Sequence, residues 1–316
     1  MPAHPAHPTG AARGVPHPAL PAPAPSAAAF DGPRFGGAVA DAWLGRHGAG
    51  RIDIPTGVVA VLALWPIRTL GAVHAPTLAD FVSRQDAARW PATAGQIAAW
   101  HWMRRPDLID TAHPLLGWAD EAHNGATLRA VRDVAQAAIR HGIFTVAGEA
   151  DPCLRSRADP LSWAITALRH GGDRSRLAEF HIPPHIADLT ARMRLGHNPP
   201  AAGEVADLAC GTGGMLRPLA QHLRENGVDP HRWRWHLQEK DPIAAAAAAV
   251  NTLLWDLGPQ ATVVCADSLQ ERSTRAQDAA RPPGLDGHHG AVCTAARTIA
   301  GQLAVLRTLE NPAPAR

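Results

Sequence analysis

The chain has 316 residues, of which 46% are hydrophobic and 18% charged, and its formal net charge is +2. This length favours two domains, and the composition is typical of a globular protein. A charge balance so close to neutral gives no overall basic field, so the net charge neither indicates nor excludes a nucleic-acid partner. A large share of glycine and proline, 28 and 29 residues, predicts extensive loops and tails.

The four cysteines are far apart and form no CxxC pair: Cys153, Cys210, Cys265 and Cys293. This spacing disfavours a structural zinc site and a disulfide framework, and it is typical of a reducing compartment. The best apolar run, residues 58–65, is too short to span a membrane, and the N-terminus lacks the features of a secretory signal. We therefore predict a cytoplasmic protein without a membrane partner or a metal site.

Residues 1–28 consist mainly of Pro, Ala and His, and they contain almost no large apolar side chain. Such a tract cannot bury enough surface to offset the entropy of ordering it, so we predict a flexible tail. In residues 35–172, helix start and stop signals recur at short intervals, which predicts a helical N-terminal domain. Residues 50–64 predict a strand or turn that leads into a buried helix.

Two helices of this domain have clear boundary signals. Apolar residues at helical spacing predict a helix from Thr127 to His141, and Gly142 follows as a stop signal. Asp159 stands directly before a proline, an arrangement that predicts a helix cap, and this helix should run to Gly171.

One aromatic and basic cluster in this domain allows two interpretations: Trp100, His101 and Trp102 are followed by Arg104 and Arg105. Such a cluster could stack on nucleic-acid bases. Neighbouring tryptophans on a short helix more often fill a hydrophobic core, so we favour a packing role.

Beyond residue 203 the pattern changes to alternating strands and helices. Short apolar runs predict strands at Glu204–Ala209, Arg234–Glu239 and Ala261–Asp267. Helices are predicted between them, at Met215–Asn226 and from Asp241 to about Trp255. This alternation with short links predicts a parallel sheet with right-handed crossovers.

A glycine-rich loop, DLACGTGGML at residues 207–216, lies between the first strand and the first helix of this pattern. Gly211 and Gly213 allow a tight turn and a close approach of a ligand to the backbone. The third glycine of a dinucleotide fingerprint is replaced by Leu216, which disfavours NAD. No G-K-[ST] sequence follows, which excludes a phosphate-binding P-loop.

An acidic residue stands at the end of each predicted strand. Asp207 suits the ammonium of an amino acid, Glu239 can accept hydrogen bonds from a ribose diol, and Asp267 can accept one from an adenine amino group. Open parallel sheets bind ligands at the carboxyl ends of their strands. The three acids therefore predict a site for S-adenosylmethionine, the alternative being that they are ordinary loop acids.

The loop resembles D-P-A-C-G-T-G-G-F-L, the cofactor loop of the type I restriction-modification methyltransferases, which modify the N-6 of adenine in DNA. LQEKDP with Asn251 is similar to that family's G-Q-E segment and the asparagine of its next helix, and ADSL at residues 266–269 resembles its third motif. Residues 179–193 are similar to its F-[YF]-T-P helix, although Ile182 replaces the threonine. The similarity covers roughly residues 175–270.

The resemblance implies an α/β fold, in which a Rossmann-like S-adenosylmethionine-dependent methyltransferase core with an incomplete parallel sheet occupies residues 175–300. A mostly helical domain would precede it, and a C-terminal helix or tail would occupy residues 301–316. S-adenosyl-L-methionine is the implied cofactor and double-stranded DNA the implied substrate, with a specificity subunit or a second methyltransferase subunit as a candidate partner. The implied cofactor-binding residues are Asp207, Ala209, Cys210, Gly211, Thr212, Gly213, Glu239, Asp267, Ser268 and Pro183.

The catalytic [ND]-P-P-[YF] segment of adenine methyltransferases is not recognisable beyond Asp267. Asn198-Pro199-Pro200 precedes the cofactor loop by too few residues, Arg281–Gly284 lacks both the amide and the ring, and a strand at residues 290–294 would be followed by two alanines. We assign no catalytic residue.

The sequence therefore leaves three hypotheses. The first is a truncated or degenerate DNA adenine methyltransferase that binds S-adenosylmethionine but has little or no activity alone. The second is a methyltransferase for a small molecule or a protein. The third is a non-catalytic partner of a longer methyltransferase.

Overall fold

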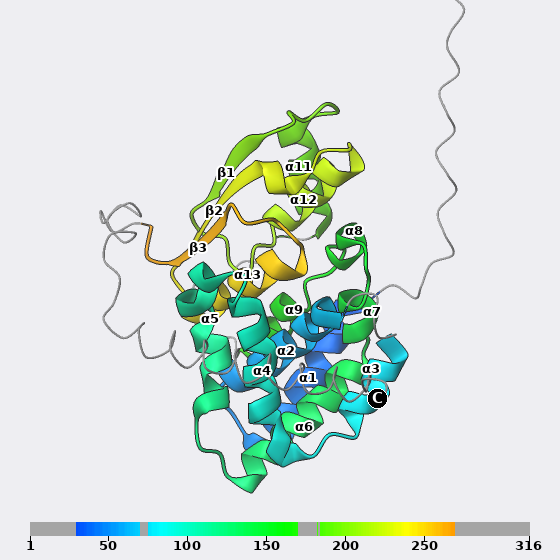
Figure 1. Cartoon of the computed structure of the whole chain (residues 1–316), viewed down its shortest axis with the longest axis vertical. Helices are drawn as coiled ribbons and strands as arrows, with labels where there is room; N and C mark the ends of the chain where they lie inside the picture. The colour runs from blue at the N-terminus through cyan, green and yellow to red at the C-terminus, as the bar shows by residue number, and fades with distance from the viewer. Residues whose placement is uncertain (1–29, 70–74, 170–181, 183, 269–316) are drawn as a thin grey trace, which may run out of the picture.

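A computed structural model of the chain describes residues 30–69, 75–169, 182 and 184–268. The predicted N-terminal tail, the Arg281–Gly284 segment, the strand at residues 290–294 and the C-terminal helix or tail lie outside the described residues. Figure 1 shows a helical region of the N-terminal half and a small sheet that follows it.

Helices make up most of the described N-terminal half. They are α1 (Gly32–His47), α2 (Asp53–Thr69), α3 (Ala75–Ser83), α4 (Trp90–Trp102), α5 (Ile109–Leu116), α6 (Gly125–Arg140), α7 (Ile143–Ala147), α8 (Pro152–Arg155) and α9 (Pro160–Leu168).

Helix α2 is the centre of this region. Its residues 58–64 are fully buried, and it packs against α4, α5, α6, α7 and α9. A helix that is apolar on every side is stable only when neighbours surround it completely, which explains its central place. The prediction of a buried helix here is confirmed, and it begins at Asp53.

Side-chain caps explain where two further helices begin, and one of these caps, Asp159, was predicted from the sequence. The side chain of Asn124 accepts hydrogen bonds from the backbone of Ala126 and Thr127, so α6 starts two residues earlier than predicted. The Asp159 carboxylate accepts from the backbone N–H of Ser162 at 3.0 Å, which confirms the predicted cap of α9. Helix α9 ends at Leu168, before the predicted Gly171, because Arg169 adopts extended backbone.

Three parallel strands form the described sheet in the order β1-β2-β3: β1 (Gly203–Asp207), β2 (Trp233–Glu239) and β3 (Ala261–Cys265). Helix α11 (Pro184–Leu195) precedes β1 and packs against α12 (Leu216–Glu225), and α13 (Pro242–Leu254) joins β2 to β3. The structure is thus helix-rich with a small parallel sheet, an arrangement compatible with an α/β methyltransferase.

Strands β1 and β3 each end two residues before the predicted position, at Asp207 and Cys265. At Asp207 the reason is visible, because its carboxylate accepts a hydrogen bond from the N–H of Ala209 and so begins a turn. The residues that were expected to complete each strand instead form the loops at the carboxyl edge of the sheet.

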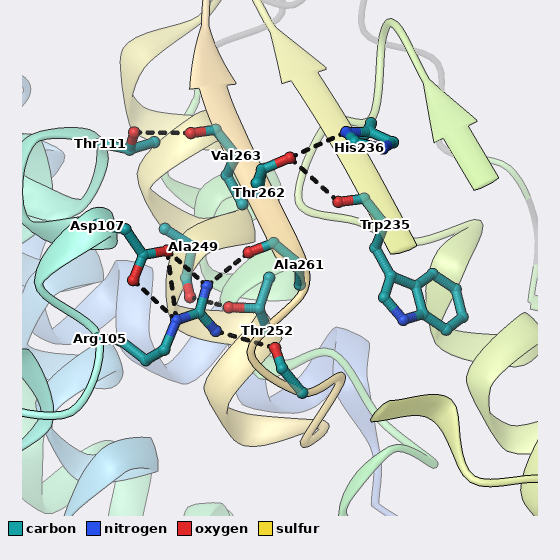
Figure 2. A network of polar contacts seen from close by, with 11 residues as sticks. Arg105, Asp107, Thr111, Trp235, His236, Ala249, Thr252, Ala261, Thr262 and Val263 are labelled. Carbon is teal, nitrogen blue, oxygen red and sulfur yellow. Dashed lines mark hydrogen bonds and ion pairs between the residues drawn. The ribbon is translucent and has the colours of Figure 1, made fainter. Parts of the chain in front are cut away.

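Helix α13 lies between the sheet and the helical region, where it packs against β2, β3, α2 and α5 (Figure 1). Side chains of the helical region also bond the edge of β3, as Figure 2 shows. Arg105 donates to the carbonyls of Gly258 and Ala261 at 3.0 and 2.5 Å, and Thr111 donates to the carbonyl of Val263 at 2.9 Å. These donors satisfy carbonyl groups that β2 does not use.

The packing interpretation of the aromatic and basic cluster is confirmed for three of its five residues. His101, Trp102 and Arg105 are buried, and the His101 ring bonds the carbonyl of Leu64 at 3.0 Å. Arg104 lies over the ring of Trp100 at 3.7 Å from its centroid, a cation–π pair at the surface. Among the described helices, none is both long and apolar enough to cross a membrane.

Candidate functional site

The glycine loop, residues 208–215, turns over the carboxyl ends of β1 and β2. The N–H of Cys210 donates to the carbonyl of Gln238 at 3.0 Å, which ties the loop to β2. The N–H of Gly213 donates to the carbonyl of Cys210 at 2.8 Å, which closes a tight turn. Backbone φ angles of +56° at Gly211 and +91° at Gly213 show why glycine is required at both positions.

The two glycines differ in what surrounds them. A Cβ atom added at Gly213 would lie 3.1 Å from a ring carbon of Trp255, whereas one added at Gly211 would meet no atom within 4 Å. Gly213 is therefore packed against the protein, and Gly211 borders open space that a ligand can enter.

This difference predicts that two alanine substitutions will have different effects. Gly213→Ala combines an unfavourable φ with crowding and should lower the free energy of unfolding by about 2 kcal/mol. Gly211→Ala should lower it by only about 1 kcal/mol, yet it should weaken binding of a ligand that contacts the loop. Thermal unfolding and ligand titration on both variants would test this contrast. Equal stability losses with equal binding would contradict it.

Backbone amides hold the Glu239 carboxylate at the rim of the loop. Its Oε2 accepts from the N–H of Gly211 at 2.9 Å, and its Oε1 accepts from the N–H of Asp241 at 2.9 Å. Each carboxylate oxygen has a second lone pair, so both oxygens can accept a further hydrogen bond. The side chain is thus fixed in one orientation and keeps the capacity to bind a pair of hydroxyl groups.

Asp207 and Glu239 together form an acidic pair at the ends of adjacent strands. Burial raises the pKa of Asp207; the hydrogen bond from Ala209 opposes this, and the nearby Glu239 carboxylate raises it further. Two carboxylates so close to one another favour a positively charged ligand group between or beside them.

Three other predicted site residues, Ala209, Cys210 and Pro183, differ in their exposure or in whether the structure describes them. Ala209 is exposed, whereas Cys210 is buried, and burial raises the pKa of its thiol strongly. The Cys210 thiol donates to the carbonyl of Gly211 at 3.4 Å, which is consistent with a packing role. Pro183 lies outside the described residues.

Asp267 and Ser268 follow β3 at the same edge of the sheet. The parallel register pairs Glu239 with Cys265, so Asp267 lies two residues beyond the level of Glu239. Asp207 is paired with Leu237, two residues before that level. The three acids thus lie at or just beyond the ends of three neighbouring parallel strands. The register and the electrostatic interaction of Asp207 with Glu239 place these two near one another, and the cofactor roles of all three stay predictions.

Sequence reasoning missed one residue that contacts the loop. The hydroxyl of Thr212 donates to the Asp159 carboxylate at 2.5 Å, and the Asn251 side chain donates to the same carboxylate at 3.0 Å. Asp159 had a sufficient local explanation as the cap of α9, so no signal in the sequence linked it to a loop 53 residues away.

Comparisons with known proteins give one finding for this region. Residues 171–281 match the family model described as N-6 DNA Methylase, a span that contains α11, the whole described sheet and the glycine loop. The described helices α1–α9 lie outside the matched span. No curated protein matches the chain.

Proposed function

Because residues 171–281 match the N-6 DNA Methylase family model, we propose that the chain binds S-adenosylmethionine at the glycine loop as part of a DNA adenine methylation system. The observation that carries this proposal is the Glu239 carboxylate, held by the amides of Gly211 and Asp241 beside the open space over Gly211.

The residues present fit this cofactor. Glu239 would accept from the two ribose hydroxyls, and Asp207 would attract the ammonium of the methionine end. Asp267 would accept from the adenine amino group, as predicted, and the open backbone over Gly211 allows close approach of the ligand. When bound, S-adenosylmethionine supplies an electrophilic methyl group on a positively charged sulfur. The acidic pair favours that charge as well.

The role of the chain in methyl transfer is to bind and orient rather than to supply a strong base. Cys210 is excluded as a nucleophile at neutral pH because burial and the two nearby carboxylates keep its thiol protonated, with a pKa far above the usual value. Holding two reactants in line can by itself supply about 7–11 kcal/mol of the barrier.

The position of the Asn198-Pro199-Pro200 segment in the structure argues against a catalytic role for it. It lies between α11 and β1, at the amino end of β1, whereas the glycine loop follows the carboxyl end. Five residues at about 3.3 Å each separate the two ends by roughly 16 Å. This segment therefore does not serve as the acceptor for an adenine amino group, in agreement with its rejection from the sequence.

We infer that the chain alone transfers methyl groups weakly or not at all, because no [ND]-P-P-[YF] segment follows Asp267 in its sequence. The same observation favours a second candidate function, a non-catalytic partner that binds the cofactor within a larger methyltransferase. A weakly active methyltransferase would methylate DNA slowly without a second subunit, whereas a non-catalytic partner would need a second subunit for any methylation.

Isothermal titration of the full chain with S-adenosylmethionine tests the proposal. We expect saturable binding at one site and no binding of NAD, which carries no cationic sulfur and needs a third loop glycine. Absence of heat from S-adenosylmethionine with a folded protein would overturn the proposal. Labelled methyl transfer onto DNA, RNA and cell extract then separates the candidates, since label only in a small-molecule or protein fraction would exclude DNA as the substrate.

A further inference from the structure

A buried polar network links the glycine loop to the helical region. Asp159, at the start of α9, is 9% exposed, and its two carboxylate oxygens have different partners. Oδ2 accepts from the hydroxyl of Thr212 at 2.5 Å. Oδ1 accepts from the Asn251 side chain and from the N–H of Ser162, each at 3.0 Å. One side chain thus joins three elements that are distant in the sequence.

Asn251 of α13 also fixes Thr212 by a hydrogen bond. Its Nδ2 donates to the carbonyl of Thr212 at 2.9 Å as well as to Asp159, and the residue is fully buried. Both the side chain and the carbonyl of Thr212 are therefore fixed. Because Thr212 stands between Gly211 and Gly213, which have no side chains of their own, these bonds set the direction of the whole turn.

Capping α9 does not by itself explain why Asp159 is buried. Four other aspartates that cap described helices make the same type of bond in exposed positions: Asp31, Asp86, Asp151 and Asp229. Asp241, the cap of α13, is buried as well, but its carboxylate forms an ion pair with Arg169. Removing a carboxylate from water is costly unless several donors compensate. Burial raises the pKa of Asp159, while the bonds from Thr212, Ser162 and Asn251 and the charge of Arg217 oppose this.

We propose that Asp159 is a positioning residue of the cofactor loop: through Thr212 and Asn251 it holds the turn in the conformation that presents Gly211 and Glu239 to the ligand. The inference rests on the proposed function, since it names a residue outside the matched family segment as part of the same cofactor site. It makes α9 of the helical region a structural component of that site.

Three substitutions separate positioning from general stability. Thr212→Val removes the hydroxyl at nearly constant volume and leaves the buried Asp159 oxygen without its donor. Thr212→Ser keeps the hydroxyl and serves as the rescue variant. Asp159→Asn keeps a residue that caps helices well, because its Oδ1 can still accept from Ser162 and Asn251, but it replaces the charged acceptor of the Thr212 hydroxyl with an amide N–H₂. Asp151→Asn, which changes the exposed cap of α8, is the matched control.

On the full chain, cofactor affinity and amide hydrogen exchange are expected to change in the same variants. Affinity for S-adenosylmethionine should fall about 10-fold in Thr212→Val and in Asp159→Asn, and stay within about 2-fold of the wild type in Thr212→Ser and Asp151→Asn. Amide hydrogen exchange without cofactor should be faster at residues 208–216 in the two weakened variants, with β2 unchanged. The double variant should bind no more weakly than the worse single variant, because both changes break one interaction.

Several outcomes would overturn the inference: wild-type affinity in Thr212→Val, equal losses in Thr212→Ser and Thr212→Val, or multiplied losses in the double variant. These results leave the proposed function intact if the wild type binds the cofactor. If the wild type does not bind it, the proposed function fails. Faster exchange at residues 208–216 would then still support the hold of Asp159 on the loop.

Discussion

Glu239→Gln is expected to weaken binding of S-adenosylmethionine by about 100-fold. The carboxylate accepts from the amides of Gly211 and Asp241, one on each oxygen. Glutamine has only one acceptor oxygen, so its N–H₂ group would face one of these amide donors and turn away from it. The substitution thus removes both a charged acceptor for the ribose hydroxyls and the bond that holds the loop at Gly211.

Isothermal titration at neutral pH measures this loss, and Glu204→Gln is its matched control. Glu204 is also a glutamate of the sheet, but it lies on β1 in an exposed position and pairs with Arg234 and His236. An exposed ion pair of this type contributes about 0–1 kcal/mol to stability, so neither folding nor binding should change much. Equal affinities of Glu239→Gln and the wild type would refute the role assigned to this carboxylate.

Arg155→Leu is expected to lower the free energy of unfolding by about 3–5 kcal/mol, the largest stability effect that we predict. The Arg155 side chain is buried and donates to three backbone carbonyls, those of Glu149, Ala150 and Leu254, at 2.8–2.9 Å. Leu254 is the last residue of α13, so this guanidinium from α8 caps the helix beside the cofactor loop.

The reason for so large an effect is that three buried acceptors would lose their donor at once, since leucine has none. Burial lowers the pKa of Arg155, because the guanidinium loses hydration. Urea unfolding with intact two-state behaviour measures the change. Arg84→Leu, which removes an exposed pair with Asp80 on α3, should change stability by less than about 1 kcal/mol, and a similar loss in both variants would contradict the prediction.

Local signals in the sequence were enough to predict most elements of the second half. Asp241 before a proline predicted the start of α13, and its side chain does accept from the N–H of Ala244 at 2.9 Å. The strands were predicted to be parallel, as they are, but β1 and β3 were each predicted to end two residues too late. Apolar residues continue past Asp207 into the turn, so hydrophobicity alone did not show where pairing stops.

Contacts between distant segments were not predictable in the same way. Arg105 was a candidate for surface or core packing, but its bonds to β3 join residues 156 positions apart. Arg155 and Leu254 are 99 positions apart. An isolated arginine in a sequence has no pattern that names its acceptor, because the acceptors are backbone carbonyls that every residue possesses.

By itself the sequence determined the glycine turn, the alternation of strands and helices around it, and the acids that follow each strand. These are local features, and parallel strands bring their carboxyl ends to one edge whatever the rest of the chain does. Only the tertiary structure decided that the amides of Gly211 and Asp241 hold Glu239, and that Asp159 of α9 holds Thr212. Those bonds depend on how α9 and α13 pack against the loop, and packing is set by side chains far apart in the sequence.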